Sequence, residues 1–148
     1  LKAVALDGKN IDYRFLHIAI AYAFQADGYA DRAKRLFDEA LQTAQVSEEH
    51  LKIGEALHGL GQTDRALKVF QGVVNQDMKT ARFWYFPDLQ AAHTFKNQQK
   101  SQACTFIARI LFDRGNKKEA IASCKQALRL DASNKIATQY LSQWQNPS

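Results

Sequence analysis

Residues 114–131 read RGNKKEAIASCKQALRLD, and this stretch decides the predicted fold of the whole chain. Gly115 is expected to end one helix, because glycine is favoured just past a helix C-terminus. Five residues later, Ala120 opens an apolar face that continues through Cys124, Ala127 and Leu128 at helical spacing. The stretch therefore predicts the end of one helix, a tight turn and a second helix.

The same unit occurs twice more in the sequence. Each copy has a glycine, then an alanine, then an aromatic residue or a cysteine at matching intervals: Gly28, Ala33 and Phe37; Gly61, Ala66 and Phe70; Gly115, Ala120 and Cys124. A matching first helix precedes each glycine, with the patterns Ile20-Ala21-x-x-Phe24, Ile53-Gly54-x-x-Leu57 and Ile107-Ala108-x-x-Leu111. An internal repeat of this kind predicts helix pairs that stack on one another.

The register resembles the tetratricopeptide repeat, a helix–turn–helix unit of about 34 residues with Ala-x-x-x-Phe in its second helix. Ala33-x-x-x-Phe37 and Ala66-x-x-x-Phe70 match that half of the unit, whereas Cys124 replaces the aromatic residue in the third copy. The family's Pro at the end of the unit is missing, and its first-helix Trp is replaced by His17, His50 and Cys104. The resemblance implies an all-α, right-handed α-solenoid of antiparallel helix pairs.

The repeats predict one domain over residues 1–148, with an insertion. Ala33 and Ala66 are 33 residues apart but Ala66 and Ala120 are 54 apart, so about 20 residues are inserted or one repeat has degenerated. Residues 6–10 resemble residues 130–134, which favours an opening tail of an earlier repeat; a short helix of independent origin is the alternative. The expected parts are this tail over 1–10, repeats over 11–46, 47–77 and 100–131, an insertion or degenerate repeat over 78–99, and a C-terminal capping helix over 132–148.

Four consecutive aromatic residues, 83–86, precede Pro87 in the insertion. Proline biases the residue before it away from the helix and suits the first turn of a new one. We therefore expect a break at this point, a short helix from Asp88 to about residue 95, and a polar loop over residues 96–100. Trp84 is expected to be buried against the second repeat.

Hydroxyl side chains mark the expected starts of three helices. Serine and threonine are favoured N-caps, because their side-chain oxygen accepts a hydrogen bond from the first turn. Ser47, Thr63 and Ser133 are therefore expected to cap the helices that follow them.

The sequence contains no catalytic or metal-binding motif. It lacks the Gly-x-x-x-x-Gly-Lys-Ser/Thr phosphate loop, the His-Glu-x-x-His zinc motif and the Gly-x-Ser-x-Gly nucleophile turn. His17 and His50 take equivalent repeat positions, which packing explains better than metal binding. Cys104 and Cys124 are expected to be free core thiols, although facing helices leave a disulfide open. We expect a protein that is not an enzyme, with no cofactor and no metal.

The first helices of the repeats are expected to line a concave groove, as they do in tetratricopeptide arrays. Their residues opposite the packing face include several that are too apolar for an ordinary solvated surface. Burial of these residues under neighbouring segments is the alternative. The candidate partner-binding residues, two of them from the insertion, are Phe15, Ile18, Tyr22, Leu51, Glu55, His58, Tyr85, Phe86, Arg109 and Phe112.

The expected partner is a protein or peptide segment, apolar or amphipathic. The carboxylate clamp of some family members is not expected, because Lys52 is the only basic residue at the corresponding positions. RNA binding is the alternative, since residues 78–148 carry 11 Lys and Arg against 4 Asp and Glu. Glu48 and Glu55 would repel phosphates from the expected groove. A structural or self-association segment is a third possibility, and no apolar run reaches the roughly 18 residues of a membrane-spanning helix.

Overall fold

The computed structural model of this chain describes residues 11–76 and 88–145. Within these residues every regular element is a helix, apart from one isolated bridge residue at Val46. The helices are α2 (Ile11–Ala26), α3 (Ala30–Thr43), α4 (Ser47–Gly59), α5 (Thr63–Asn75), α6 (Leu89–Asp113), α7 (Lys117–Leu130) and α8 (Lys135–Gln145). The predicted all-α fold is confirmed.

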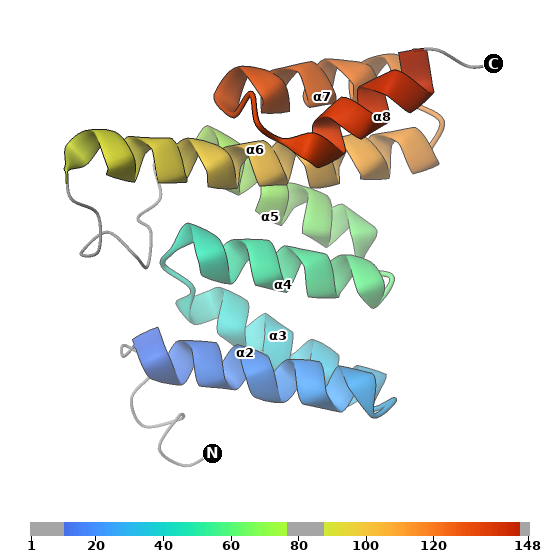
Figure 1. Cartoon of the computed structure of the whole chain (residues 1–148). Helices are drawn as coiled ribbons and strands as arrows, with labels where there is room; N and C mark the ends of the chain where they lie inside the picture. The colour runs from blue at the N-terminus through green and yellow to red at the C-terminus, as the bar shows by residue number, and fades with distance from the viewer. Residues whose placement is uncertain (1–10, 77–87, 146–148) are drawn as a thin grey trace.

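The helices form antiparallel pairs that stack into an α-solenoid (Figure 1). The pairs are α2 with α3, α4 with α5, and α6 with α7, and α8 packs against the last pair. In Figure 1 the first helices α2, α4 and α6 lie toward the viewer, and α3 and α5 lie behind them. The array of helix pairs expected from the repeats is therefore present.

A glycine makes each turn within a pair, as the repeat predicts. Gly28, Gly61 and Gly115 have φ angles of 87°, 80° and 85°, in the left-handed region that glycine adopts at no steric cost. The residue after each glycine donates its backbone N–H to the carbonyl five residues earlier, for example Tyr29 to Phe24 at 2.9 Å. This pattern is the Schellman motif, which satisfies the last carbonyls of the first helix.

Small residues bring the two helices of each pair into close contact. Ala33, Ala66 and Ala120 are all 0% exposed. Gly54 of α4 faces the ring of Phe70 on α5, and a Cβ atom at Gly54 would lie 2.7 Å from that ring. The repeated small positions are therefore buried within the helix pairs, and at Gly54 the neighbouring helix leaves no room for a larger side chain.

A buried ion pair joins the first helix pair to the second. Arg14 Nε of α2 donates to Glu49 Oε2 of α4 at 3.0 Å, and the two side chains are 5% and 0% exposed. The other carboxylate oxygen of Glu49 accepts the backbone N–H groups of Gln45 and Val46 at 3.0 and 3.2 Å. One carboxylate therefore holds α2 and also satisfies donors at the start of α4.

The prediction of a loop over residues 96–100 is wrong, because these residues belong to α6, a single helix of 25 residues. Lys and Gln are good helix formers, so a polar run of them does not end a helix. The start of α6 agrees with expectation, since Asp88 Oδ1 accepts the N–H of Ala91 at 2.8 Å. The expected break at Phe86-Pro87 and the position of Trp84 lie outside the described residues.

Three helix starts differ from expectation by one residue. Ser47 and Thr63 are the first helical residues of α4 and α5, and Val46 and Gln62 precede them at the N-cap position. At α8 the cap is Asn134, whose Oδ1 accepts the N–H of Ala137 at 3.0 Å. Ser133 instead donates its hydroxyl to Asp131 at 2.6 Å.

Asn134 also ties three helices together. Its Nδ2 donates to the hydroxyls of Ser101 and Thr105 on α6 at 2.8 and 2.9 Å. The Ser101 hydroxyl in turn donates to the carbonyl of Ala127 on α7 at 2.7 Å. Asn134 thus fixes α8 against the α6–α7 pair through a satisfied polar network.

Replacing Asn134 with Ala should lower the free energy of unfolding by at least about 1 kcal/mol, the usual effect of losing an N-cap side chain, because the hydrogen bonds to Ser101 and Thr105 are lost as well. Urea denaturation monitored by circular dichroism measures this change. Ser133→Ala is the matched control, and its effect should stay within about 0.5 kcal/mol because Ser133 is exposed. A larger effect for Ser133 than for Asn134 would contradict the assignment of the cap.

Candidate protein-binding groove

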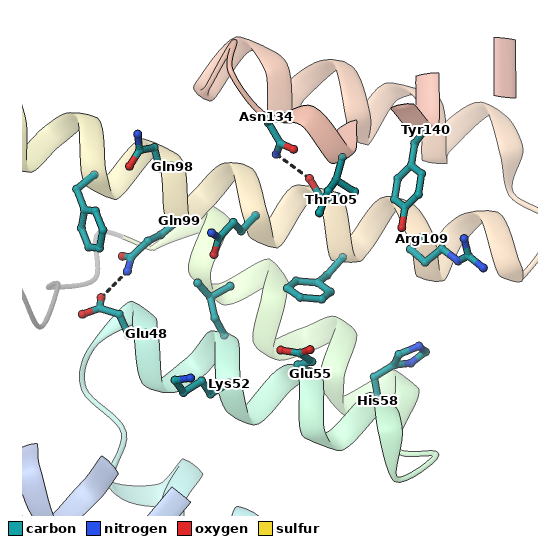
Figure 2. Close-up of a pocket in the computed structure, with 15 residues that line it drawn as sticks. Glu48, Lys52, Glu55, His58, Gln98, Gln99, Thr105, Arg109, Asn134 and Tyr140 are labelled. Carbon is teal, nitrogen blue, oxygen red and sulfur yellow. Dashed lines mark hydrogen bonds between the residues drawn. The ribbon is translucent and has the colours of Figure 1, made fainter. Parts of the chain in front are cut away.

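A groove of about 720 Å³ lies between α4, α6 and the start of α8 (Figure 2). One wall is a face of α4, where helical spacing of three and four residues aligns the side chains. These side chains are Glu48, Leu51, Lys52, Glu55 and His58. The opposite wall comes from α6 and α8, with Phe95, Gln98, Gln99, Gln102, Thr105, Phe106, Arg109, Asn134, Ile136 and Tyr140.

The groove contains apolar side chains that continue into the core. Leu51 is 8% exposed, and the Phe106 ring is half-buried and stacks on Phe70 with centroids 4.7 Å apart. Ile136 of α8 is 53% exposed at the edge of the groove. A segment entering here would therefore meet apolar surface supported by rigid packing.

Amide side chains of α6 provide polar groups along the same groove. Gln98 and Gln102 are exposed. Gln99 is 4% exposed, and its Nε2 donates to Glu48 Oε1 on α4 at 2.6 Å. The Gln99–Glu48 hydrogen bond therefore connects the two walls at one end (Figure 2).

Tyr140, which lines the groove, belongs to an aromatic stack. The Phe112, Trp144 and Tyr140 rings stack in that order, with centroids 4.3 and 4.6 Å apart. The guanidinium of Arg109 lies 5.9 Å from the Tyr140 centroid and hydrogen-bonds Asp113 at 3.2 Å. This hydrogen bond to Asp113 raises the pKa of Arg109.

Glu55 lies beside the contact between α4 and α2. The hydroxyl of Tyr22 on α2 donates to the backbone carbonyl of Lys52 at 2.6 Å. Burial, and to a smaller extent the negative charge of Glu55, raise the pKa of Tyr22 to about 12.

The groove brings together four of the predicted binding residues: Leu51, Glu55, His58 and Arg109. The expectation for Ile18 needs correction, because this residue is 2% exposed and belongs to the core. Phe15 and Tyr22 are half-buried against that core, and Phe112 stacks on Trp144. Tyr85 and Phe86 lie outside the described residues. A binding role for the four groove residues stays a prediction.

Sequence reasoning missed most of the α6 and α8 contribution. Gln98 and Gln99 fall in the loop expected over residues 96–100, and Phe95 lies at the end of the short helix expected before it, so none of the three was predicted to line a groove. Their spacing to Gln102 and Arg109 follows one helix face, which would have identified them if residues 96–100 had been read as helix. The groove residues of α8, Ile136 and Tyr140, come from a helix that was expected only to cap the array.

His17, His50 and the two cysteines lie outside the groove. His17 Nε2 lies 3.1 Å from the Leu36 carbonyl, and His50 Nδ1 lies 2.9 Å from the Val46 carbonyl. Cys104 and Cys124 are free and buried, as expected, and burial raises the pKa of each thiol to about 11. Among residues 11–76 and 88–145, no group of His, Cys, Asp and Glu could hold a metal ion. Among the helices of residues 11–76 and 88–145, none is both long and apolar enough to span a membrane.

The family model described as "Tetratricopeptide repeat" matches residues 101–134. The chain carries a tetratricopeptide repeat. The matched segment covers all of α6 after Lys100, all of α7 and the loop up to Asn134, and it overlaps the predicted repeat over 100–131. No curated protein shows a significant match to the sequence.

Tetratricopeptide repeats are in general protein–protein interaction modules that bind protein partners, and the family is generally non-catalytic. In this chain the matched repeat supplies the α6 wall of the groove from Gln102 to Arg109. The groove is thus formed in part by residues of the repeat itself.

Proposed function

We propose that this chain is a protein-interaction module whose groove between α4, α6 and α8 binds an apolar or amphipathic segment of a partner protein. The observation that carries the proposal is the combination of an apolar floor, formed by Leu51 and Phe106, with exposed amides along one wall. The volume of about 720 Å³ lies within the usual range of binding pockets, about 300–1,000 Å³.

The chemistry of the lining suits a polypeptide. The side-chain amides of Gln98 and Gln102 can each donate and accept hydrogen bonds, as a peptide backbone does. Leu51, Phe106 and Ile136 offer apolar contacts to its side chains. Both a helix laid in the groove and an extended segment satisfy these requirements.

Nucleic acid is a poorer occupant of the same groove. The α4 wall carries the carboxylates of Glu48 and Glu55, which repel phosphates. The basic residues of α7 outside this groove, such as Lys117, Lys118, Lys125 and Arg129, are exposed. Their helix does not line the groove, so their charge is not concentrated there.

Filling the groove should abolish binding without unfolding the chain. The probe is a set of peptides selected on the wild-type chain from a random 12-residue phage-displayed library. Replacing Gln102 with Trp places a large ring between the walls, and we expect the selected peptides to bind at least about tenfold more weakly, or about 1.4 kcal/mol. Fluorescence anisotropy with synthetic peptides measures the affinity.

Gln42→Trp is the matched control, because Gln42 is an exposed residue of α3 that does not line the groove. This variant should bind the peptides as the wild type does, and both variants should keep the helical circular dichroism signal. Selection of peptides whose binding is unaffected by Gln102→Trp, or of none at all, would contradict the proposal.

A further inference from the structure

We infer that Glu55 is the specificity-determining residue of the groove and that the bound segment presents a Lys or Arg side chain to it, flanked by apolar residues. This inference rests on the proposed function, since it names the chemistry of the partner at that same groove. It follows from the distribution of charge among the groove residues.

The two carboxylates of the groove differ in their partners. Glu48 accepts a hydrogen bond from Gln99 at 2.6 Å, at the end where the walls meet. Glu55 is exposed and makes no ion pair or hydrogen bond with any residue of the described part of the chain. Figure 2 shows Glu55 on the α4 wall between Lys52 and His58. Its charge is therefore available to a ligand in the middle of this wall.

The nearby cationic groups are already engaged or lie outside hydrogen-bonding reach of Glu55. Arg109 pairs with Asp113 at 3.2 Å and lies over the Tyr140 ring. His58 Nδ1 lies 3.2 Å from the Thr63 hydroxyl. Lys52 is one turn earlier on α4 and forms no ion pair with Glu55 within 4 Å. A cation from the partner would therefore not displace an existing ion pair of Glu55.

The surroundings of Glu55 also suit the stem of a long basic side chain. Leu51 and Phe106 line the same groove, and Lys and Arg bury their methylene groups along apolar surface while the charged end reaches a partner. The aromatic ring of Phe106 can in addition attract a cation by its face. A charge-assisted hydrogen bond to the Glu55 carboxylate is stronger than a neutral one, so it can select the partner.

Lys52 carries a positive charge in the same groove, so a partner that binds through an acidic residue is the competing possibility. It is exposed on the same wall, one turn from Glu55, and would favour an acidic partner. The two residues therefore make a matched pair: loss of one charge should weaken the true ligand, and loss of the other should not.

The test uses the 148-residue chain and peptides selected on it from a random 12-residue phage-displayed library. We expect the selected peptides to share a Lys or Arg between apolar residues. These peptides should bind Glu55→Gln at least about tenfold more weakly than wild type, and Lys52→Gln with equal or higher affinity. Acetylating the shared lysine, or replacing a shared arginine with citrulline, should cause a similar loss with the wild-type chain and a much smaller loss with Glu55→Gln.

The outcomes separate this inference from the proposed function. Peptides that lose binding to Gln102→Trp but bind Glu55→Gln as they bind wild type would overturn the inference and leave the groove proposal intact. Acidic peptides that depend on Lys52 would overturn it as well. If no selected peptide responds to Gln102→Trp, the groove itself is wrong and the inference fails with it.

Discussion

Replacing Glu49 with Ala should lower the free energy of unfolding by about 3–5 kcal/mol, the usual cost of removing one partner of a buried ion pair. Glu49 is 0% exposed, and its loss removes the carboxylate that pairs with Arg14, whose side chain is 5% exposed. It also leaves the backbone N–H groups of Gln45 and Val46 without the carboxylate that accepts them. Urea denaturation measures the effect, and we expect the midpoint to fall while the dependence of the free energy of unfolding on urea concentration stays unchanged.

A surface ion pair provides the control for this prediction. Asp64 accepts a hydrogen bond from Arg114 at 2.6 Å, but its side chain is 84% exposed. Asp64→Ala should therefore change stability by no more than about 1 kcal/mol. If Glu49→Ala has an effect as small as Asp64→Ala, the carboxylate does not join the first helix pair to the second as described.

Gly54→Ala should destabilise the chain even though alanine is the better helix former. In a helix interior alanine is favoured over glycine by about 1 kcal/mol. At Gly54, however, the new Cβ would lie 2.7 and 2.9 Å from ring atoms of Phe70. Phe70 is 0% exposed and stacks on Phe106, so its ring cannot move freely. Overpacking costs about 1–3 kcal/mol, which exceeds the propensity gain of about 1 kcal/mol over most of this range, so we expect a net loss of up to about 2 kcal/mol.

The same substitution at Gly59 of the same helix is the matched control. A Cβ there meets only Gln25 Nε2, at 3.1 Å, which is the end of a flexible side chain. Gly59→Ala should leave the urea midpoint unchanged or raise it by the equivalent of up to about 1 kcal/mol. A gain in stability from Gly54→Ala would show that α4 and α5 do not pack as closely at this point as the structure has them.

The sequence predicted the helix pairs because each turn repeats the same local chemistry. The left-handed glycines Gly28, Gly61 and Gly115 and the buried alanines that follow them recur at a fixed spacing. Residues 96–100 lacked such a signal, since Lys and Gln occur equally well in exposed helices and loops. The cap at Asn134 was missed because Ser133 is a comparable N-cap residue and only the fold shows which side chain meets Ala137.

The groove was less predictable than the fold. Ile18 and Leu51 take the same position in successive first helices, and both are less than a tenth exposed and belong to the core cluster. Helical spacing identifies which residues share a face but not which part of that face the next helix covers. The α8 residues Ile136 and Tyr140 enter the groove only because α8 packs back on α6.

Hydrogen–deuterium exchange of the chain with a selected peptide tests the central claim, that the groove between α4, α6 and α8 is the binding surface. The account predicts slower amide exchange on binding within Ser47–Gly59, in α6 from about residue 95 to residue 109, and at the start of α8, with α3 unchanged. Slower exchange confined to α3 or α7, with α4 and α6 unaffected, would contradict it.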